Sequence, residues 1–480
     1  MKIFIFVNKY LKNYKLMLLF FIILCCAAWI LSLSIPYITG KFIDTLVNVR
    51  TKSGIVTFIK VLTAVFVLDI LISSTKSIVD ARLKNSVSFD LNYSVLEHIK
   101  RLPYSYFRGI NTGYLTQRIH SDSFSTVFFV IENSIGIFIS IATLLSVGLY
   151  TFYTSRAITL LILLFLPVYV LIYILHKGPL YKKEYEYKEN QNKFFSKLNE
   201  QIYKIKLIKI NSWFDVLGIE LKKSFSPVLK SLLDYTKIML LYSGSSKALN
   251  YIIKIIVFVA CGFQVVEGRM TVGELTAISA YFGMLVDCIN YFIGFGKGYQ
   301  STLVSYNRLK EILDIELEPN GSILPESINE IEVNSLCFSH NKDGKSIFNN
   351  FNYKFKKGNI YCISGRNGIG KSTLIDLITG LIHDYKGCIL YNSTNIKELD
   401  LYSLRKKLIG ITEQEPSLFN DTVANNLTYG LEAYKEHKLT GYLNKLNMSD
   451  MISNLPEGLN SILKKKLTIC PAEKNRNCQL

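Results

Sequence analysis

The side chains with the clearest chemical potential lie in one glycine-rich stretch. Its pattern is G-x-x-x-x-G-K-[ST], in which glycines let successive backbone N–H groups turn inward around phosphate oxygens. At this spacing Lys371 would reach the β- and γ-phosphates of a nucleotide, and the Ser372 hydroxyl would ligate Mg²⁺. The stretch consists of Gly365, Arg366, Asn367, Gly368, Ile369, Gly370, Lys371, Ser372 and Thr373. It predicts a purine nucleotide site, the alternative being a chance glycine-rich turn.

Two flanking elements must hold this loop in place. Residues Asn359–Ser364, immediately before it, predict a buried strand. Residues Leu374–Leu381, immediately after it, predict a helix whose N-terminal dipole would favour the negative charge of a phosphate. A strand, a loop and a helix in this order are the context in which the motif binds nucleotides.

The chain as a whole is too long and too apolar for one soluble domain. Of its 480 residues 49% are hydrophobic, and six apolar segments each approach the roughly 20 residues that a helix needs to cross the hydrocarbon core. These segments cover approximately residues 16–38, 55–75, 127–153, 157–176, 247–266 and 272–296. We therefore expect a multi-pass protein of the cell membrane, surrounded by the lipid bilayer.

The distribution of basic residues indicates the orientation of the chain. The formal net charge is +18, and Lys and Arg crowd two long polar loops, residues 76–126 and 177–246. Because such loops stay on the cytoplasmic side, we expect both loops, both termini and the nucleotide-binding domain in the cytoplasm. Helical periodicity in the loops predicts helices that continue beyond the membrane. No arginine-rich tract or RNA-binding signature accompanies the charge, so nucleic-acid binding is not expected.

Two charged residues lie within the spans, Asp69 in the second and Lys254 in the fifth. Each could face a cavity and touch cargo, or it could pair locally or extend toward the interface. For Lys254 we favour a side chain that extends toward the interface. For Asp69 both alternatives stay open. The nine cysteines form no C-x-x-C pair and predict reduced, buried thiols rather than disulfides or a metal site.

These features give an expected domain organisation. An all-α six-helix transmembrane domain covers residues 1–315, and a linker covers residues 316–330. An α/β P-loop nucleotide-binding domain, incomplete, covers residues 331–466, and residues 467–480 form an aberrant tail. Within the nucleotide-binding domain, Ile331–Phe338 alternates between apolar and polar residues, which predicts an edge or sandwich strand.

Six spans followed by a phosphate-loop domain on the same chain resemble an ABC exporter half-transporter. Local stretches are similar to that family as well: Pro36–Gly40, Phe42–Asp44, Leu102–Phe107, Thr112–Ile119 with Asp122, and Met270–Leu275. The resemblance implies ATP-driven export of an unidentified substrate by a dimer, in which a second half-transporter is identical or different. It also implies ATP and Mg²⁺ as cofactors.

Two further site residues are implied by this resemblance. The stretch Gly410–Phe419 is similar to the family's Q-loop, so Gln414 would contact Mg²⁺ or the attacking water. The Q-loop would also touch the membrane domain and carry nucleotide state to it. His340, shortly after the first strand of the domain, corresponds to the aromatic residue that stacks on adenine in the family.

Several parts that the family uses for catalysis do not occur in this sequence. It contains no Leu-Ser-Gly-Gly-Gln signature loop, no strand ending in Asp-Glu and no switch histidine after it. A shifted reading frame from Leu467 onward permits a signature-like loop, so we interpret Leu467–Leu480 as a frameshifted tail. The alternative function is a truncated half-transporter or remnant that binds ATP weakly and does not hydrolyse it. In that case apolar surface beside the phosphate-loop strand should be uncovered.

Overall fold

The computed structural model of the protein describes residues 2–48, 52–107, 112–339, 346–412, 417–429 and 436–463. These residues form two compact units. The first unit contains residues 2–99 and 112–314, and the second contains residues 100–107 together with those from 315 onward. The predicted fold class, membrane helices followed by an α/β unit, is confirmed.

The first unit is helical throughout its described secondary structure. Its short helices are α1 (Lys2–Leu11), η1 (Lys12–Tyr14) and α7 (Ile205–Asn211). Its long helices are α2 (Lys15–Asn48), α3 (Lys52–Ile99), α5 (Thr112–Thr154), α6 (Arg156–Tyr203), α8 (Phe214–Val266) and α9 (Val272–Leu313). Each long helix contains one predicted span, and all six are long and apolar enough to cross a membrane.

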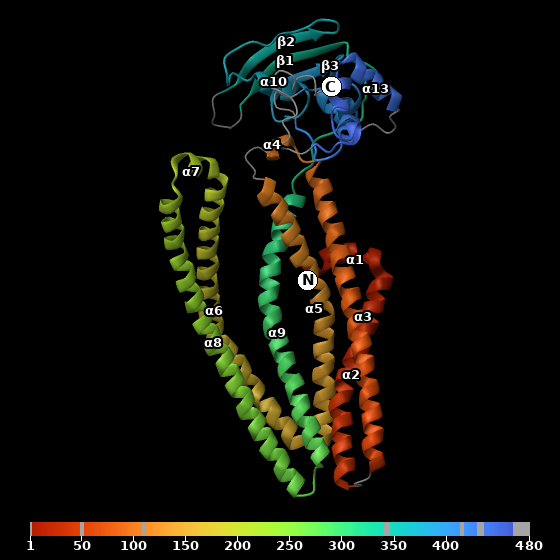
Figure 1. The fold of residues 1–480 in the computed structure, drawn as a ribbon, viewed down its shortest axis with the longest axis vertical. Coiled ribbons are helices and arrows are strands. Elements are labelled where there is room, and N and C mark those ends of the chain that lie inside the picture. The colour runs from red at the N-terminus through yellow and green to blue at the C-terminus, as the bar shows by residue number, and fades with distance from the viewer. Residues whose placement is uncertain are drawn as a thin grey trace. The chain divides into compact units, whose positions relative to one another are not determined.

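The long helices extend well past the hydrocarbon core, as the periodicity of the loops predicted. Helix α3 has 48 residues, so it measures about 72 Å against about 30 Å for the core. Figure 1 shows α6 and α8 side by side and joined through α7, and α2, α3, α5 and α9 packed together. The chain turns at Ser212, which closes α7 in a left-handed conformation.

Two glycines bring α2 and α9 into close contact. A Cβ atom on Gly273 would overlap the Gly40 carbonyl oxygen, so the two helices approach here through backbone atoms. The Asp44 carboxylate accepts hydrogen bonds from the Gly273 N–H and the Thr271 hydroxyl, both at 2.8 Å. Thr271 is the N-cap of α9 and forms a capping box with Glu274. The beginning of α9 is therefore tied to the end of α2.

The second unit is built on an antiparallel sheet of order β2-β1-β3-β4. Its strands are β1 (Glu330–Phe338), β2 (Phe348–Lys356), β3 (Lys386–Tyr391) and β4 (Thr394–Asn395). Its helices are α4 (Tyr104–Phe107), α10 (Lys371–Ile378), η2 (Ile396–Glu398), α11 (Leu401–Lys407), α12 (Val423–Thr428), α13 (Glu436–Lys445), α14 (Ser449–Ser453) and η3 (Gly458–Asn460). Figure 1 shows α10 close to this sheet.

Helix α10 is held against the sheet by the core of the second unit. Leu374 and Leu377 of α10 pack in one buried cluster with Val333 of β1 and Ile389 of β3. The Tyr391 hydroxyl at the end of β3 donates to the Ile378 carbonyl at 2.7 Å. The sheet therefore fixes the helix that follows the glycine-rich loop.

The strand expected at residues 331–338 is present as β1. Of the two expected positions it is not the edge one, because it pairs with β2 on one side and β3 on the other. Two other sequence predictions in this unit differ from the structure. The helix expected at 374–381 begins earlier, at Lys371, and ends at Ile378. Residues 359–364 form no strand, since within the described residues no ladder partner lies beside them.

The unpaired run 359–364 leaves apolar surface exposed. Ile360 is fully exposed and Ile363 is 41% exposed, although both are typical of buried strands. The run is anchored at its beginning, where the Tyr361 hydroxyl oxygen accepts a hydrogen bond from the Lys356 N–H at 2.8 Å. The uncovered apolar surface that we expected beside the phosphate loop is present.

The two charged residues within the spans lie in different surroundings. Lys254 is exposed on α8 among Tyr251, Ile255 and Phe258, which agrees with the preferred interpretation of a side chain that extends from the helix. Asp69 is half-buried on α3. Neither residue forms an ion pair within the part of the chain that the structure describes.

Candidate nucleotide-binding site

The glycine-rich loop runs without regular structure up to the first residue of α10. Gly368 and Gly370 have φ angles of 81° and 110°, a left-handed backbone that other residues rarely adopt. A Cβ atom on Gly370 would also overlap the Ile347 side chain and lie 3.2 Å from Phe348 Cζ. The loop is thus seated against the beginning of β2 at a position where only glycine fits.

Lys371 closes this loop on itself. Its ammonium group donates to the carbonyl oxygens of Gly365 at 2.7 Å and Arg366 at 3.0 Å. Because Lys371 is also the first residue of α10, these bonds hold the loop over the N-terminus of the helix. The partial positive charge of the helix terminus and the Lys371 ammonium therefore lie on the same side of the loop.

The remaining residues of the stretch are mostly open to solvent. Arg366, Asn367 and Ser372 are exposed, and Ile369 is 58% exposed. Thr373 is buried and faces the core rather than solvent. All nine loop residues predicted from the sequence are contiguous and described, whereas Gln414 and His340 lie outside the described residues.

In the described ranges, the loop has no competing cluster of metal-binding side chains. Among the described residues, no group of three or more His, Cys, Asp and Glu side chains could hold a metal. A magnesium ion at the loop would depend on the Ser372 hydroxyl and on oxygens of the nucleotide. The exposed hydroxyl at the helix N-terminus fits such a role.

The far end of α10 is fixed by a buried ionic cluster that sequence reasoning missed. Arg405 of α11 donates to the Thr379 carbonyl at 3.1 Å and to the Gly380 carbonyl at 2.5 Å. The same guanidinium pairs with Glu318 Oε1 at 2.5 Å. His383 Nε2 lies 3.0 Å from that carboxylate oxygen. The Glu318 carboxylate therefore contacts both His383, which follows α10, and Arg405, which binds the carbonyls at the end of α10.

The electrostatics of this cluster favour an ionised Glu318. Burial alone would raise its pKa, but hydrogen bonds from His383 and Arg405, together with their charges, outweigh burial and lower the pKa below its usual value. The side chain of Glu318 is 8% exposed and that of Arg405 is 21% exposed. The pair is therefore largely shielded from solvent.

Glu318 also connects the cluster to the segment around α4. Its backbone N–H donates to the Arg101 carbonyl at 2.7 Å, and Leu102, the next residue, is 3% exposed. No local sequence pattern indicates this cluster, because His383 and Arg405 follow Glu318 by 65 and 87 residues. A chain of hydrogen bonds thus leads from the end of α10 to residue 101.

The comparisons with known proteins agree with this geometry. Residues 16–288, more than half of the chain, match the family model described as the ABC transporter transmembrane region. Residues 348–470 match the model described as ABC transporter, and this stretch contains the phosphate loop.

Three relatives illustrate the similarity. The uncharacterized ABC transporter ATP-binding protein YwjA of Bacillus subtilis is 23% identical over 95% of this chain and 80% of its own length. The alpha-hemolysin translocation ATP-binding protein HlyB of Escherichia coli O157:H7 is 25% identical over 83% of this chain. The putative multidrug export ATP-binding/permease protein YgaD of Bacillus subtilis is 22% identical over 78%. The matches span 56% of HlyB and 65% of YgaD.

Proposed function

Because this chain belongs to the ABC transporter family, we propose that it is one half of an ATP-driven exporter in a cell membrane. The proposal is supported by six helices of membrane-spanning length and by a phosphate loop on the same chain. Relatives named for toxin translocation and multidrug export agree with the direction of transport. The substrate would cross within the helical unit, and nucleotide binding would bias the conformation of that unit.

Nucleotide binding is assigned to the loop and to the first turn of α10. The exposed backbone of residues 365–370 would surround the phosphates, and the Lys371 ammonium would exchange its bonds to the loop carbonyls for bonds to phosphate oxygens. When bound, Mg²⁺ would neutralise part of the phosphate charge. The Ser372 hydroxyl is the residue of this loop that would hold the ion.

Four further assignments extend the family assignment. We place the long basic loops, both termini and the nucleotide-binding unit on the cytoplasmic side, since those loops carry the excess of Lys and Arg. We assign Gln414 to sensing Mg²⁺ or water, and His340 to stacking on adenine. A second half-transporter, identical or different, would complete the exporter as a dimer.

The observation that carries the proposal is the position of Lys371 over the loop at the N-terminus of α10. A fluorescent trinitrophenyl-ATP should bind the purified chain in nanodiscs and be displaced by ATP. Lys371→Ala should weaken binding by about tenfold or more, because a charge-assisted contact to phosphate is lost. Lys386→Ala, at an exposed lysine of the same unit, is the matched control and should bind normally. Equal binding by Lys371→Ala and the unmodified chain would refute the assignment.

A second candidate function is favoured by the exposed run 359–364. In this reading the chain is a half-transporter that binds ATP weakly and does not hydrolyse it. A loop preceded by an unpaired segment is less well preorganised for phosphoryl transfer. Phosphate release by the purified chain decides between the two, since a robust rate that Lys371→Ala abolishes supports the active exporter, and a background rate supports the second candidate.

A further inference from the structure

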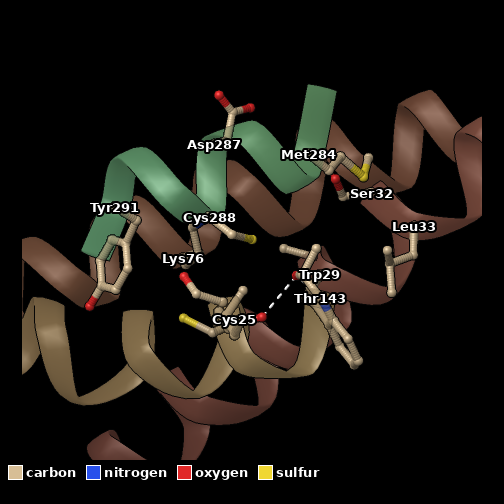
Figure 2. A pocket seen from close by; sticks show the side chains of 13 residues that line it. Cys25, Trp29, Ser32, Leu33, Lys76, Thr143, Met284, Asp287, Cys288 and Tyr291 are labelled. Atoms are coloured by element: carbon tan, nitrogen blue, oxygen red, sulfur yellow. Dashed lines mark hydrogen bonds between the residues drawn. The ribbon is translucent and has the colours of Figure 1, made fainter. Parts of the chain in front are cut away.

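A cavity of about 400 Å³ lies within the first unit, lined by residues of α2, α3, α5 and α9 (Figure 2). This volume falls within the range of small-molecule sites in proteins. Cys25, one of its lining residues, lies ten residues along α2 from Lys15, or about 15 Å into the helix. The cavity is therefore at the depth of the spans rather than at the ends of the long helices.

The walls of the cavity are fixed by hydrogen bonds. The Trp29 indole N–H donates to the Thr143 hydroxyl at 2.8 Å, which holds the ring across the cavity (Figure 2). On α9, the Tyr291 hydroxyl donates to Asn133 Oδ1 at 3.0 Å. Gly136 makes room for Tyr291, since a Cβ atom there would lie 2.6 Å from its hydroxyl oxygen. The two aromatic rings are thus positioned before any ligand arrives.

One positive charge in the cavity forms no ion pair with any residue that the structure describes. Lys76 of α3 lines the cavity and is half-buried. Asp80 lies one helical turn from Lys76 on α3. Asp80 is already paired with Lys84 at 2.8 Å. Within the part of the chain that the structure describes, Lys76 forms no ion pair.

The acidic residue of the same cavity faces another way. Asp287 of α9 lines the cavity but is exposed, and its carboxylate points away from Trp29 and Cys288 (Figure 2). It lies outside ion-pair distance of Lys76. Among the described residues that line the cavity, Lys76 therefore has no acidic side chain paired with it. An unpaired ionisable group inside a membrane bundle is costly and marks a position where a ligand supplies the counter-charge.

We infer that this cavity binds an amphipathic anion, whose anionic group pairs with Lys76 while its apolar body packs against Trp29. The inference rests on the proposed function, since it names the class of molecule that the exporter would carry. Ser32 and Ser140 also line the cavity, and their hydroxyls are of the type that donates hydrogen bonds to an anion. A carboxylate or a phosphate ester on an alkyl or aromatic body would meet these requirements.

The two tryptophans of the chain, Trp29 and Trp213, allow a direct test. In a Trp213→Phe background, full-length chain in nanodiscs is titrated without nucleotide with an ω-bromo-undecanoate, whose bromine quenches indole fluorescence. We expect saturable quenching of Trp29 that undecanoate without bromine reverses. The trimethylammonium analogue of the same brominated chain should quench without saturation, as expected for partition into lipid.

Three variants identify the charge that binds. Lys76→Gln should weaken the bromo-undecanoate affinity by about tenfold, since a contact to a charged group is lost. Lys76→Arg keeps the charge and should bind within about twofold of the background protein. Asp287→Asn is the matched control at the same cavity and should bind as tightly or more tightly, because it removes a negative charge.

Two results would overturn the inference: unchanged affinity in Lys76→Gln, or saturable binding of the trimethylammonium probe with loss of binding in Asp287→Asn. The second result would assign the cavity to cations. Trinitrophenyl-ATP binding by the same preparation is measured separately. A chain that binds nucleotide but not the carboxylate probe refutes the cavity assignment alone, and the converse result refutes the nucleotide site alone.

Discussion

Glu318 and Arg405 form a short, largely buried ion pair, with Arg405 Nη2 at 2.5 Å from Glu318 Oε1. Around this pair the carbonyls at the end of the phosphate-loop helix, the His383 ring and the Arg101 carbonyl are all within hydrogen-bond distance of one partner or the other. Because both charges are shielded, loss of one partner leaves the other without compensation. The pair is therefore expected to contribute more to the second unit than its exposed ion pairs do.

We predict that Glu318→Gln destabilises the second unit by about 3 kcal/mol, which corresponds to a fall of about 6–12 °C in its unfolding midpoint. The exposed pair between Lys354 and Glu330, at 2.9 Å, provides the control. Lys354→Gln should cost much less than Glu318→Gln, because water and salt screen an exposed pair. Thermal unfolding followed by limited proteolysis of the second unit measures both, and equal effects would mean that burial does not strengthen the pair.

The pH dependence of the second unit should follow from the same carboxylate. The pKa of Glu318 is lowered in the folded state from its usual value of 4.5. The stability that it contributes is therefore fully present above pH 4.5 and is lost as the pH falls through the folded-state pKa. Asp400 and Asp421 shift in the same direction. Glu318→Gln should accordingly flatten, but not abolish, the loss of stability below pH 4.5, and an unchanged slope would exclude Glu318 as its source.

Replacement of Gly370 should damage the phosphate loop through both backbone strain and overlap. Gly370→Ala places a methyl group against Ile347 at a φ of 110°, and we expect trinitrophenyl-ATP affinity to fall by about tenfold or more. Gly358→Ala is the control outside the loop, because Gly358 has a φ of 83° but no atom near its Cβ position. The control should retain nucleotide binding. A normal affinity for Gly370→Ala would mean that the loop tolerates displacement from β2.

The contact between α2 and α9 gives a fourth prediction. Gly273→Ala would insert a methyl group against the Gly40 carbonyl, where backbone cannot easily withdraw. We expect a loss of about 1–3 kcal/mol, detected as a lower temperature of aggregation for the chain in detergent. Gly283→Ala, on the same helix but with open space at its Cβ position, should be neutral or slightly stabilising. If both variants behave alike, the close approach at Gly273 does not limit stability.

The parts of the molecule that were predictable from the sequence are those fixed by local patterns. Six spans follow from the number of consecutive apolar residues, because the bilayer sets that number. The turn from the glycine-rich loop into α10 follows from residues 365–373, whose spacing already specifies the backbone. Both features depend only on residues that are close together in the sequence.

The parts that were missed depend on residues far apart in the chain. Asn359–Ser364 has the composition of a strand, but a strand also requires a neighbouring strand to pair with. The described sheet, of order β2-β1-β3-β4, does not include these residues. Glu318 lies in a segment predicted as a linker, and no residue near it in the sequence indicates a contact with His383 or Arg405. The charge of Lys76 in the cavity likewise depends on a contact in the folded helix, because the nearby Asp80 is paired with Lys84.

The hydrogen bonds between Lys371 and its own loop have a consequence for nucleotide affinity. Its ammonium group donates to the Gly365 and Arg366 carbonyls, so a phosphate that binds to Lys371 would replace those bonds. The gain on binding is then mainly the difference in charge between a neutral carbonyl and a polyanion. Such a difference is weakened by mobile ions, so occupancy of this exposed loop should decline as ionic strength rises.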